Sequence, residues 1–244
     1  MSLFVIPFPL IDPVAIELGP IAVRWYGISY MAGLLLGWYY LRKLVTDSSL
    51  WNGKSPLNIS DLDDLIIYVT VGVIVGGRLG HVLLYQPQHY ITDPLAIFMV
   101  WQGGMAFHGG LIGTILAIMI FSVRNSVNPL YVGDLVCTAV PIGLFFGRIA
   151  NFINAELVGK VSEVPWAMIF PGTDAIPRHP SQLYEAALEG LLLFLILRYL
   201  THRKRALRHN GLITGTFMFC YGLFRIFAEI FREGDPVPGL DLGS

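Results

Sequence analysis

The 244-residue chain combines 55% hydrophobic residues with only 14% charged residues, and its mean hydropathy is +0.63. Soluble globular domains carry about 25% charged residues, so the composition excludes an ordinary soluble protein and predicts a chain that lies in a bilayer. A formal net charge of −1 gives no basic footprint for nucleic-acid binding. Cys137 and Cys220 lie far apart in apolar runs, so we expect neither a disulfide framework nor a metal site.

Six apolar stretches are each long enough to cross a hydrocarbon core of about 30 Å as a helix. We predict membrane spans at residues 23–41, 65–85, 104–123, 130–152, 183–200 and 212–231. The apolar piece 94–101 is too short to cross and is predicted to be an interfacial or re-entrant helix. The predicted fold class is therefore an all-α polytopic membrane helix bundle. Residues 1–244 are expected to form a single transmembrane domain, in which residues 154–182 form a small extracytoplasmic cap.

The basic residues of the connecting segments indicate the orientation, because cytoplasmic loops are enriched in Lys and Arg. Basic residues follow the first, third and fifth spans, whereas the connection 86–103 contains none. The basic residues near the end of the fifth span are Arg198, Arg203, Lys204, Arg205 and Arg208. We expect this loop in the cytoplasm and both termini outside. The N-terminus has no cleavable signal pattern, so the first span is expected to serve as the insertion signal.

Ionisable residues at membrane depth are functional candidates, because each costs about 2.5 kcal/mol or more unless it is paired or faces a polar cavity. The candidates, all expected in the outer half of the bilayer, are Arg24, Arg78, His108, Arg148 and Arg225. A guanidinium can bind two phosphate oxygens at once, so these arginines suggest the head group of an anionic phospholipid. Snorkelling of Arg24 and Arg78, or an ion pair between Arg225 and Glu229, would account for single residues without a ligand.

The glycine-rich stretch 103–110, GGMAFHGG, places a titratable imidazole between small residues. Close packing of membrane helices explains small residues without any function. Alternatively, the glycines leave room for a substrate beside His108, which could act as a general base or a hydrogen-bond donor. The residues alone leave both interpretations open.

The run 147–159, GRIANFINAELVG, closely resembles the signature of bacterial prolipoprotein diacylglyceryl transferases. Other matching motifs, in the family's order, are RWYG at 24–27, GRLG at 77–80, FHGG at 107–110, RHPSQLYE at 178–185 and YGLFRIFAEIFR at 221–232. The resemblance covers essentially the whole chain, whereas one glycine pair or one arginine would be weak evidence. The family pattern continues into a seventh span, so the end at Ser244 is expected to be a truncation. Ala150 stands where the family commonly has glycine.

The resemblance implies a transferase of the bacterial inner membrane with its active site toward the outer leaflet. Its implied partners are phosphatidylglycerol, preprolipoprotein signal peptides with a lipobox cysteine, and membrane lipid; no metal or organic cofactor is implied. The cysteine thiol would attack the glyceryl carbon that bears the phosphate, forming a thioether and releasing glycerol 1-phosphate. The implied catalytic residues are His108, Arg148, Tyr221 and Arg225. The implied phosphatidylglycerol-binding residues are Tyr26, Arg78, Arg148, Asn151, Glu156, Gly159 and Arg225.

This chemistry assigns expected tasks to the candidate residues. A thiol with a pKa of about 8.5 must lose its proton, which His108 or the field of the arginines could promote. Arg148 and Arg225 are expected to stabilise the negative charge that develops on the leaving phosphate. The residues expected to orient the two substrates by hydrogen bonding are Asn151, Glu156 and Tyr221.

Two other classes of protein fit part of the pattern. A multi-span transporter of an anionic solute would also use buried arginines, but the two halves of the chain show no convincing repeat, and the arginines lie toward one face rather than at the midplane. A non-catalytic lipid-binding scaffold would use the arginines and the cap, and it would not need His108 or Tyr221.

Overall fold

The computed structural model describes residues 6–9, 11–18, 21–100 and 103–234. The chain divides into two compact units. The first unit comprises residues 1–39, 137–204 and 213–244, and the second comprises residues 40–136 and 205–212. That the whole chain acts as one transmembrane domain stays a prediction.

Helices account for most of the described residues. The α-helices are α1 (Trp25–Thr46), α2 (Ile59–Leu84), α3 (Pro87–Thr92), α4 (Phe107–Arg124), α5 (Pro129–Ile153), α6 (Ser181–Glu185), α7 (Leu193–His202) and α8 (Leu212–Glu229). The short 3₁₀-helices are η1 (Ser48–Leu50), η2 (Pro94–Phe98) and η5 (Ala206–Arg208), and η4 (Ala186–Leu192) is a π-helix. The strands are β1 (Ile6–Pro7), β2 (Val14–Leu18), β3 (Ile21–Arg24) and β4 (Met168–Ile169).

The predicted all-α membrane bundle is confirmed, with helix at each of the six predicted positions. Four helices within the described residues, α2, α4, α5 and α8, are long and apolar enough to cross a membrane by length and composition. Helix α1 also has sufficient length, but its many Trp and Tyr residues lower its hydropathy. The predicted short piece 94–101 begins with the 3₁₀-helix η2 and is preceded by α3, which the sequence analysis did not predict. Trp101 lies outside the described residues.

The fifth predicted span is a composite rather than one regular helix. Its α-helical start α6 passes into the π-helical turn of η4, and the regular α-helix resumes as α7. A π-turn accommodates an extra residue and changes the direction of the side chains that follow it. Hydropathy measures only apolar length, so it could not reveal this irregularity.

Strands before the first helix correct the predicted start of the first span. β2 and β3 form an antiparallel hairpin in which Val14 pairs with Arg24 and Ile16 with Val23. Branched apolar residues at these positions suit a strand, and α1 begins only at Trp25. Arg24 is therefore the last residue of a strand, and its side chain is exposed.

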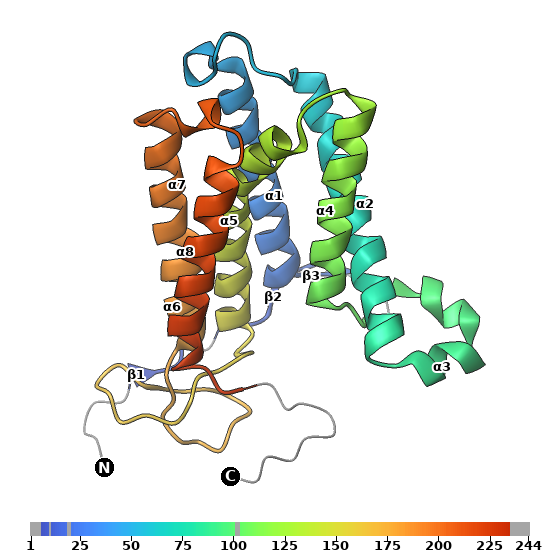
Figure 1. Cartoon of the computed structure of the whole chain (residues 1–244). Helices are drawn as coiled ribbons and strands as arrows, with labels where there is room; N and C mark the ends of the chain where they lie inside the picture. Colours follow the sequence, from blue (N-terminus) through green and yellow to red (C-terminus); the bar gives the residue numbers. More distant parts are fainter. Residues whose placement is uncertain (1–5, 10, 19–20, 101–102, 235–244) are drawn as a thin grey trace. The chain divides into compact units, whose positions relative to one another are not determined.

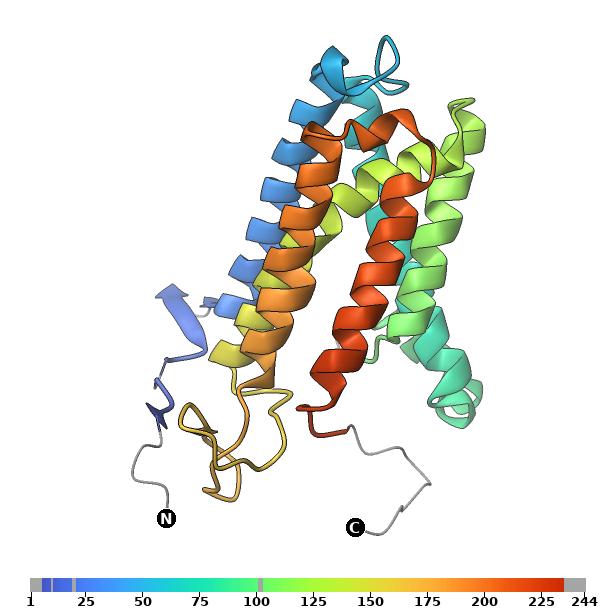
Figure 2. The same cartoon turned by 60° about the vertical axis from the view of Figure 1, so that its left-hand side comes forward.

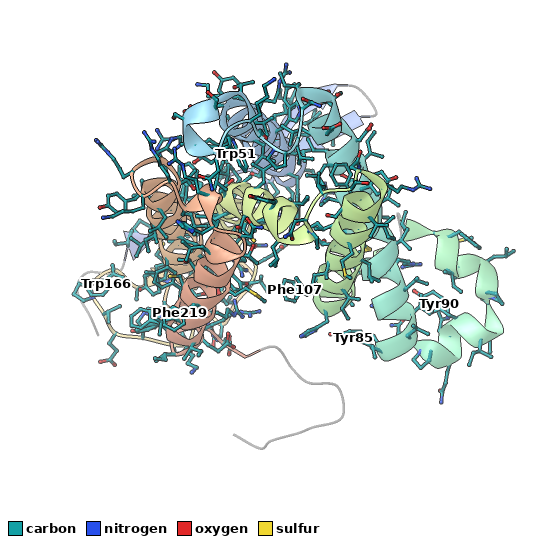
Figure 3. All side chains as sticks on the ribbon, turned by 45° about the horizontal axis from the view of Figure 1, so that its top comes forward. Trp51, Tyr85, Tyr90, Phe107, Trp166 and Phe219 are labelled. Carbon is teal, nitrogen blue, oxygen red and sulfur yellow. The ribbon has the colours of Figure 1, made fainter. Side chains whose placement is uncertain are left out.

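In the second unit, α2 and α4 run side by side, as Figure 1 shows. Glycines allow the close approach: a Cβ atom at Gly76 would collide with the backbone of Gly109 and Gly113. This is the small-residue packing typical of membrane helices. Beyond the end of α2, the chain forms a short arm from α3 and η2. Figure 3 shows Tyr90 inside this arm, where the ring packs with Val82 and Ala96.

In the first unit, α5, α7 and α8 run alongside one another in both Figure 1 and Figure 2. The segment 154–180 gathers at one end of these helices. Phe170 of this segment forms a small apolar core with Phe8 and Phe152, and the ring centroid of Phe8 lies 5.2 Å from that of each of the other two rings. Strand β1 pairs in parallel with β4 of this segment. The predicted cap therefore has a packed interior and is tied to the N-terminal strand.

Candidate active site

A buried network of ion pairs joins four helical elements of the first unit, α5, α6, η4 and α8. Arg148 of α5 contacts Glu185 through Nε and Oε2, 2.9 Å apart, and Glu189 through Nη2 and Oε2, 3.3 Å apart. Arg225 of α8 contacts Glu185 through Nη1 and Oε1, 3.0 Å apart. Its Nη2 lies 2.7 Å from Oε2 of Glu229, one helical turn further on. The expected pair between Arg225 and Glu229 is thus present, but within a larger network.

The two central carboxylates are almost completely shielded from solvent. Only 1% of the Glu185 side chain and none of the Glu189 side chain is exposed, whereas Arg148 is 16% and Arg225 26% exposed. An unpaired buried carboxylate would be very costly, so the two arginines compensate the two glutamates. The exposed part of each arginine side chain is what a ligand could reach.

Both guanidinium groups keep donors that no described residue occupies. The partners of Arg148 use Nε and Nη2, which leaves Nη1 without a partner among the described residues. The partners of Arg225 use Nη1 and Nη2, so Nε of Arg225 also has no partner among the residues that the structure describes. Because a guanidinium has five N–H donors, each arginine can hold its glutamates and bind an anion together.

Tyrosines from two other helical positions accompany this network. Tyr221, one turn before Arg225 on α8, interacts electrostatically with Glu189 and Arg148. On α1, the ring of Tyr26 lies 5.0 Å from that of Tyr30, and their hydroxyl oxygens are 3.5 Å apart. Tyr30 in turn interacts electrostatically with Arg148. The implied residues Tyr26 and Tyr221 therefore accompany the arginines within the first unit.

The loop after α5 holds Glu156 in a strained backbone. Ala155 and Leu157 on either side have φ values of 55° and 54°, in the left-handed region that non-glycine residues rarely adopt. Asn151 Nδ2 donates to Glu156 Oε2 at 3.4 Å, and Gln182 Nε2 donates to the Glu156 carbonyl at 2.6 Å. Such strain persists only where the surroundings enforce it and is common at functional sites. The implied pair of Asn151 and Glu156 is thus brought together.

Gly159 lies buried where the cap crosses the end of α8. Its N–H donates to the His179 carbonyl at 3.0 Å, and it forms a β-bridge with Arg232. A Cβ atom at Gly159 would collide with the carbonyl oxygens of His179 and Phe231. The position therefore requires glycine for packing. Its contacts give no direct indication of the implied role in lipid binding.

Arg178 connects the cap to the residues that follow α8. Its guanidinium pairs with Glu233 at 2.5 Å and with Asp174 at 3.1 Å, and its Nη1 donates to the Gly159 carbonyl at 3.3 Å. The hydrogen bonds from Arg178 hold the pKa of Asp174 below its ordinary value. The implied site loop 154–159 is therefore held by a second, peripheral set of ion pairs.

Arg78 in the second unit is occupied by its own surroundings. Its Nε donates to the Ile97 carbonyl at 2.9 Å, and its remaining four N–H groups donate to backbone carbonyls as well. Those acceptors belong to Ala96, Met99, Gly103 and Gly104. Five carbonyls match five donors, and the side chain is only 4% exposed. Arg78 could donate to a phosphate only if one of its hydrogen bonds to these carbonyls were broken.

His108 lies in the first turn of α4 rather than several residues into the span, and it is exposed. It lines an apolar groove of about 730 Å³ along α2 and α4, which ends near Arg124. Its ring meets the edge of the Phe107 ring, 5.6 Å away. Arg78 does not line this groove, so these two candidates lie in separate environments of the second unit. That Arg78, His108, Arg148 and Arg225 line one connected cavity stays a prediction.

The structure adds residues that the sequence analysis did not single out. Glu185 and Glu189 are the only acids within the predicted span 183–200, and that was the available signal, because an acid at membrane depth is a functional candidate by the same rule as the arginines. Among the described residues, His, Cys, Asp and Glu side chains form no group of three that could hold a metal ion.

The chain is similar to known proteins along nearly its whole length. A family model described as prolipoprotein diacylglyceryl transferase matches residues 13–243. A protein of Methylocella silvestris is 51% identical over 241 residues, which cover 99% of this chain and 88% of the relative. A Rhizobium meliloti protein is 51% identical, and the match covers 99% of this chain and 87% of that protein. A Rhodopseudomonas palustris protein is 50% identical, and the match covers 100% of this chain and 86% of that protein. All three relatives are named phosphatidylglycerol–prolipoprotein diacylglyceryl transferase.

Proposed function

Because this chain belongs to the prolipoprotein diacylglyceryl transferase family, we propose that it transfers diacylglyceryl from phosphatidylglycerol to a cysteine thiol of prolipoproteins. The observation that carries the site assignment is the pair of arginines, Arg148 and Arg225, held by buried glutamates with donors to spare. Neither alternative class, an anion transporter or a lipid-binding scaffold, draws support from the relatives' names. The acceptor is the lipobox cysteine of the preprolipoprotein signal peptide.

The reaction is a substitution at carbon. The cysteine sulfur forms a bond to the glyceryl carbon that bears the phosphate, and the bond from that carbon to the phosphate oxygen breaks. The oxygen leaves with the phosphate as glycerol 1-phosphate, which takes up the proton that the thiol has lost. The products are a diacylglyceryl thioether and glycerol 1-phosphate, and the balance needs no other reactant.

Arg148 and Arg225 stabilise the leaving group. Charge grows on the phosphate as the carbon–oxygen bond breaks, and fixed donors stabilise such charge most where water is excluded. The guanidinium groups are fixed before the lipid arrives, because Glu185 contacts both of them. Little reorganisation is therefore needed when the phosphate binds.

The remaining candidates orient the substrates and handle the proton. His108 is the proposed acceptor of the thiol proton, and the positive field of the arginines lowers the cost of forming the thiolate. Tyr26, Asn151, Glu156 and Tyr221 are proposed to orient the lipid glycerol and the peptide by hydrogen bonds. Gly159 supports the site through the backbone that it holds in place, and Arg78 holds the backbone of residues 96–99 and 103–104.

The protein is a membrane protein of this family, and we place it in the bacterial inner membrane. Its active site faces the outer leaflet in this proposal, with the N-terminus outside. The distribution of loop arginines and lysines supports this orientation.

The direct test is a transfer assay with a defined product. Purified protein is incubated with phosphatidylglycerol and a lipobox peptide, and mass spectrometry follows the peptide. The expected result is a mass increase of one diacylglyceryl group on the cysteine. A peptide with serine in place of that cysteine, and vesicles of phosphatidylcholine alone, are the controls. The proposed function would be contradicted if no adduct formed from a lipid and a peptide that a known transferase of this kind converts.

A further inference from the structure

We propose that Glu189 is a positioning residue that limits how tightly Arg148 and Arg225 hold the phosphate, so that the phosphate product can leave. The proposal rests on the proposed function, because it concerns the phosphate of the lipid substrate. It assigns Glu189 a task distinct from that of Glu185. Glu185 bridges the two guanidinium groups, whereas Glu189 supplies a second negative charge behind them.

The contacts of Glu189 are poor for a residue with a purely structural role. Its side chain is fully buried, yet Oε1 accepts no hydrogen bond among the described residues and lies 3.8 Å from Arg225 Nη1. Oε2 lies 3.3 Å from Arg148 Nη2. A buried ion pair repays its desolvation only with good geometry and satisfied oxygens. Glu185 also has one oxygen, Oε2, that accepts no hydrogen bond among the described residues, but that oxygen lies 2.9 Å from Arg148 Nε. Glu189 therefore gains less from its ion pairs than Glu185 does, and what it adds to the site is chiefly charge.

The π-helical turn fixes this charge in place. Glu189 lies within η4 (Ala186–Leu192), four residues after Glu185. π-turns are rare and frequently mark functional sites. The next residue, Gly190, packs directly on the backbone of Phe145 of α5, and a Cβ atom there would collide with it. The absence of a side chain at Gly190 lets η4 pack directly on α5, and this close approach brings Glu189 within reach of Arg148.

The balance of charge predicts the direction of the effect. Arg148 and Arg225 carry two positive charges, and Glu185 and Glu189 carry two negative charges in the same buried space. Arg225 also pairs with the half-exposed Glu229 at 2.7 Å. Loss of the Glu189 charge would make the buried part of the site more positive, and this would attract the phosphate of the substrate and the phosphate of the product alike. Tighter binding of both ground states does not raise the rate of the chemical step, and it slows release.

The test compares charge variants at this position. Glu189→Gln keeps the size and removes the charge, and it is expected to lower the Kd for phosphatidylglycerol about tenfold or more. It should strengthen inhibition by glycerol 1-phosphate to a similar extent and reduce kcat. Glu189→Asp keeps the charge, but the side chain is one methylene shorter and holds the carboxylate farther from the two arginines. The Kd of this variant for phosphatidylglycerol should therefore fall between those of wild type and Glu189→Gln. Glu163→Gln, an exposed cap residue, is the matched control and should leave all values unchanged.

Binding of phosphatidylglycerol, counted by native mass spectrometry, is measured separately from transfer. If wild-type protein binds the lipid but forms no adduct, the proposed function fails, and the binding series still tests Glu189. A Kd for Glu189→Gln equal to or above the wild-type value, in monodisperse protein with an unchanged thermal transition, overturns the inference. If Glu189→Gln does not fold, Glu189→Asp decides: a lower Kd supports the inference, and an unchanged or higher Kd overturns it.

Discussion

Nε of Arg148 on α5 and Oε2 of Glu185 on α6 lie 2.9 Å apart, and the other Glu185 oxygen lies 3.0 Å from Nη1 of Arg225 on α8. One buried carboxylate therefore fixes two guanidinium groups that are distant in sequence. A site for an anion needs such a device, because two unrestrained arginines would repel each other and take many rotamers. The arrangement explains why a signature motif around Arg148 and one around Arg225 occur in the same chain.

Replacing Arg148 by lysine is expected to remove most transfer activity without unfolding the protein. Lysine keeps the charge but has no planar fork, so it cannot hold Glu185 and two phosphate oxygens together. Loss of one fixed donor in a dry site typically lowers the rate by about 10²–10³. The measurement is the initial transfer rate at matched amounts of monodisperse protein. Arg124→Lys, at the far end of α4, is the control, and a wild-type rate for Arg148→Lys would place the phosphate on Arg225 alone.

The arginines could be predicted from the sequence because charge inside an apolar stretch is conspicuous. Arg148 and Arg225 stand out in this way, and the structure brings them to the same two glutamates. The hydrogen bonds of Arg78 could not be predicted, because its partners are backbone carbonyls that leave no trace in residue identity. Burial and acceptor count separate Arg78 from the other two, although all three are arginines in apolar helices.

Arg78→Ala is expected to destabilise the arm formed by α3 and η2 rather than to act only on lipid binding. The change would leave the buried Ala96 carbonyl and four partly buried carbonyls without this donor, and an unsatisfied buried group costs about 1–3 kcal/mol. Hydrogen exchange should therefore show faster exchange of amides in residues 87–100 by at least about tenfold. Arg124→Ala is the matched control, because the exposed Arg124 donates to the Tyr68 hydroxyl at 2.7 Å and to no backbone carbonyl of the described residues. Unchanged exchange in the arm would show that these carbonyl contacts contribute nothing to its stability.

The cap illustrates a different limit of sequence analysis. Residues 154–182 were predicted to form an extracytoplasmic cap because they separate two apolar stretches. The fold of the cap depends on pairing between distant segments, such as Ile6 with Met168 and Gly159 with Arg232. Neither periodicity nor composition identifies such pairs. The strands β1 and β4 were missed for the same reason, since each has two residues and pairs with a distant segment. The hairpin of β2 and β3 is local, and it too was missed.

Gly159→Ala is expected to open the crossing between the cap and the end of α8. The added methyl group would collide with two carbonyl oxygens that belong to backbone rather than to a flexible side chain. Overpacking of this kind costs about 1–3 kcal/mol. We expect a lower thermal transition and faster proteolysis within residues 160–178. Gly215→Ala in α8, where a Cβ atom meets nothing within 4 Å, serves as control. Equal stability of the two variants would refute the packing explanation.

The cap should lose stability as the pH falls below about 6.5, because burial lowers the pKa of His179 from its ordinary value. Between the lowered folded pKa and the unfolded pKa, the unfolded chain binds a proton that the folded chain does not. Stability is therefore complete above about pH 6.5 and declines as the pH falls through the folded pKa. The measurement is amide protection of the cap at pH 7.5 and pH 5.5, corrected for intrinsic exchange.

His179→Asn isolates this contribution. The ring of His179 packs against those of Tyr184 and Phe231, which also contact each other, and its Nδ1 lies 3.1 Å from the Tyr184 hydroxyl. Asparagine remains polar but does not titrate, so the variant's cap protection should change less between the two pH values, whatever its overall stability. The helix pair α2 and α4 provides an internal reference in the same sample. An identical pH response in wild type and variant would assign the loss of stability to other groups.

The orientation of the chain is tested by labelling cysteines on either side of the membrane. The five basic residues 198–208 are expected to hold their loop in the cytoplasm, and His202 ends α7 within it with an exposed side chain. In a background with Cys137→Ser and Cys220→Ser, His202→Cys should react with an impermeant thiol reagent only after the cells are opened. Glu163→Cys in the exposed part of the cap should react in intact spheroplasts. The reverse pattern would turn the arginine network toward the cytoplasmic leaflet. It would also exclude a reaction with signal peptides at the outer face, because the cap and the ion pairs of Arg225 lie at the same end of α8.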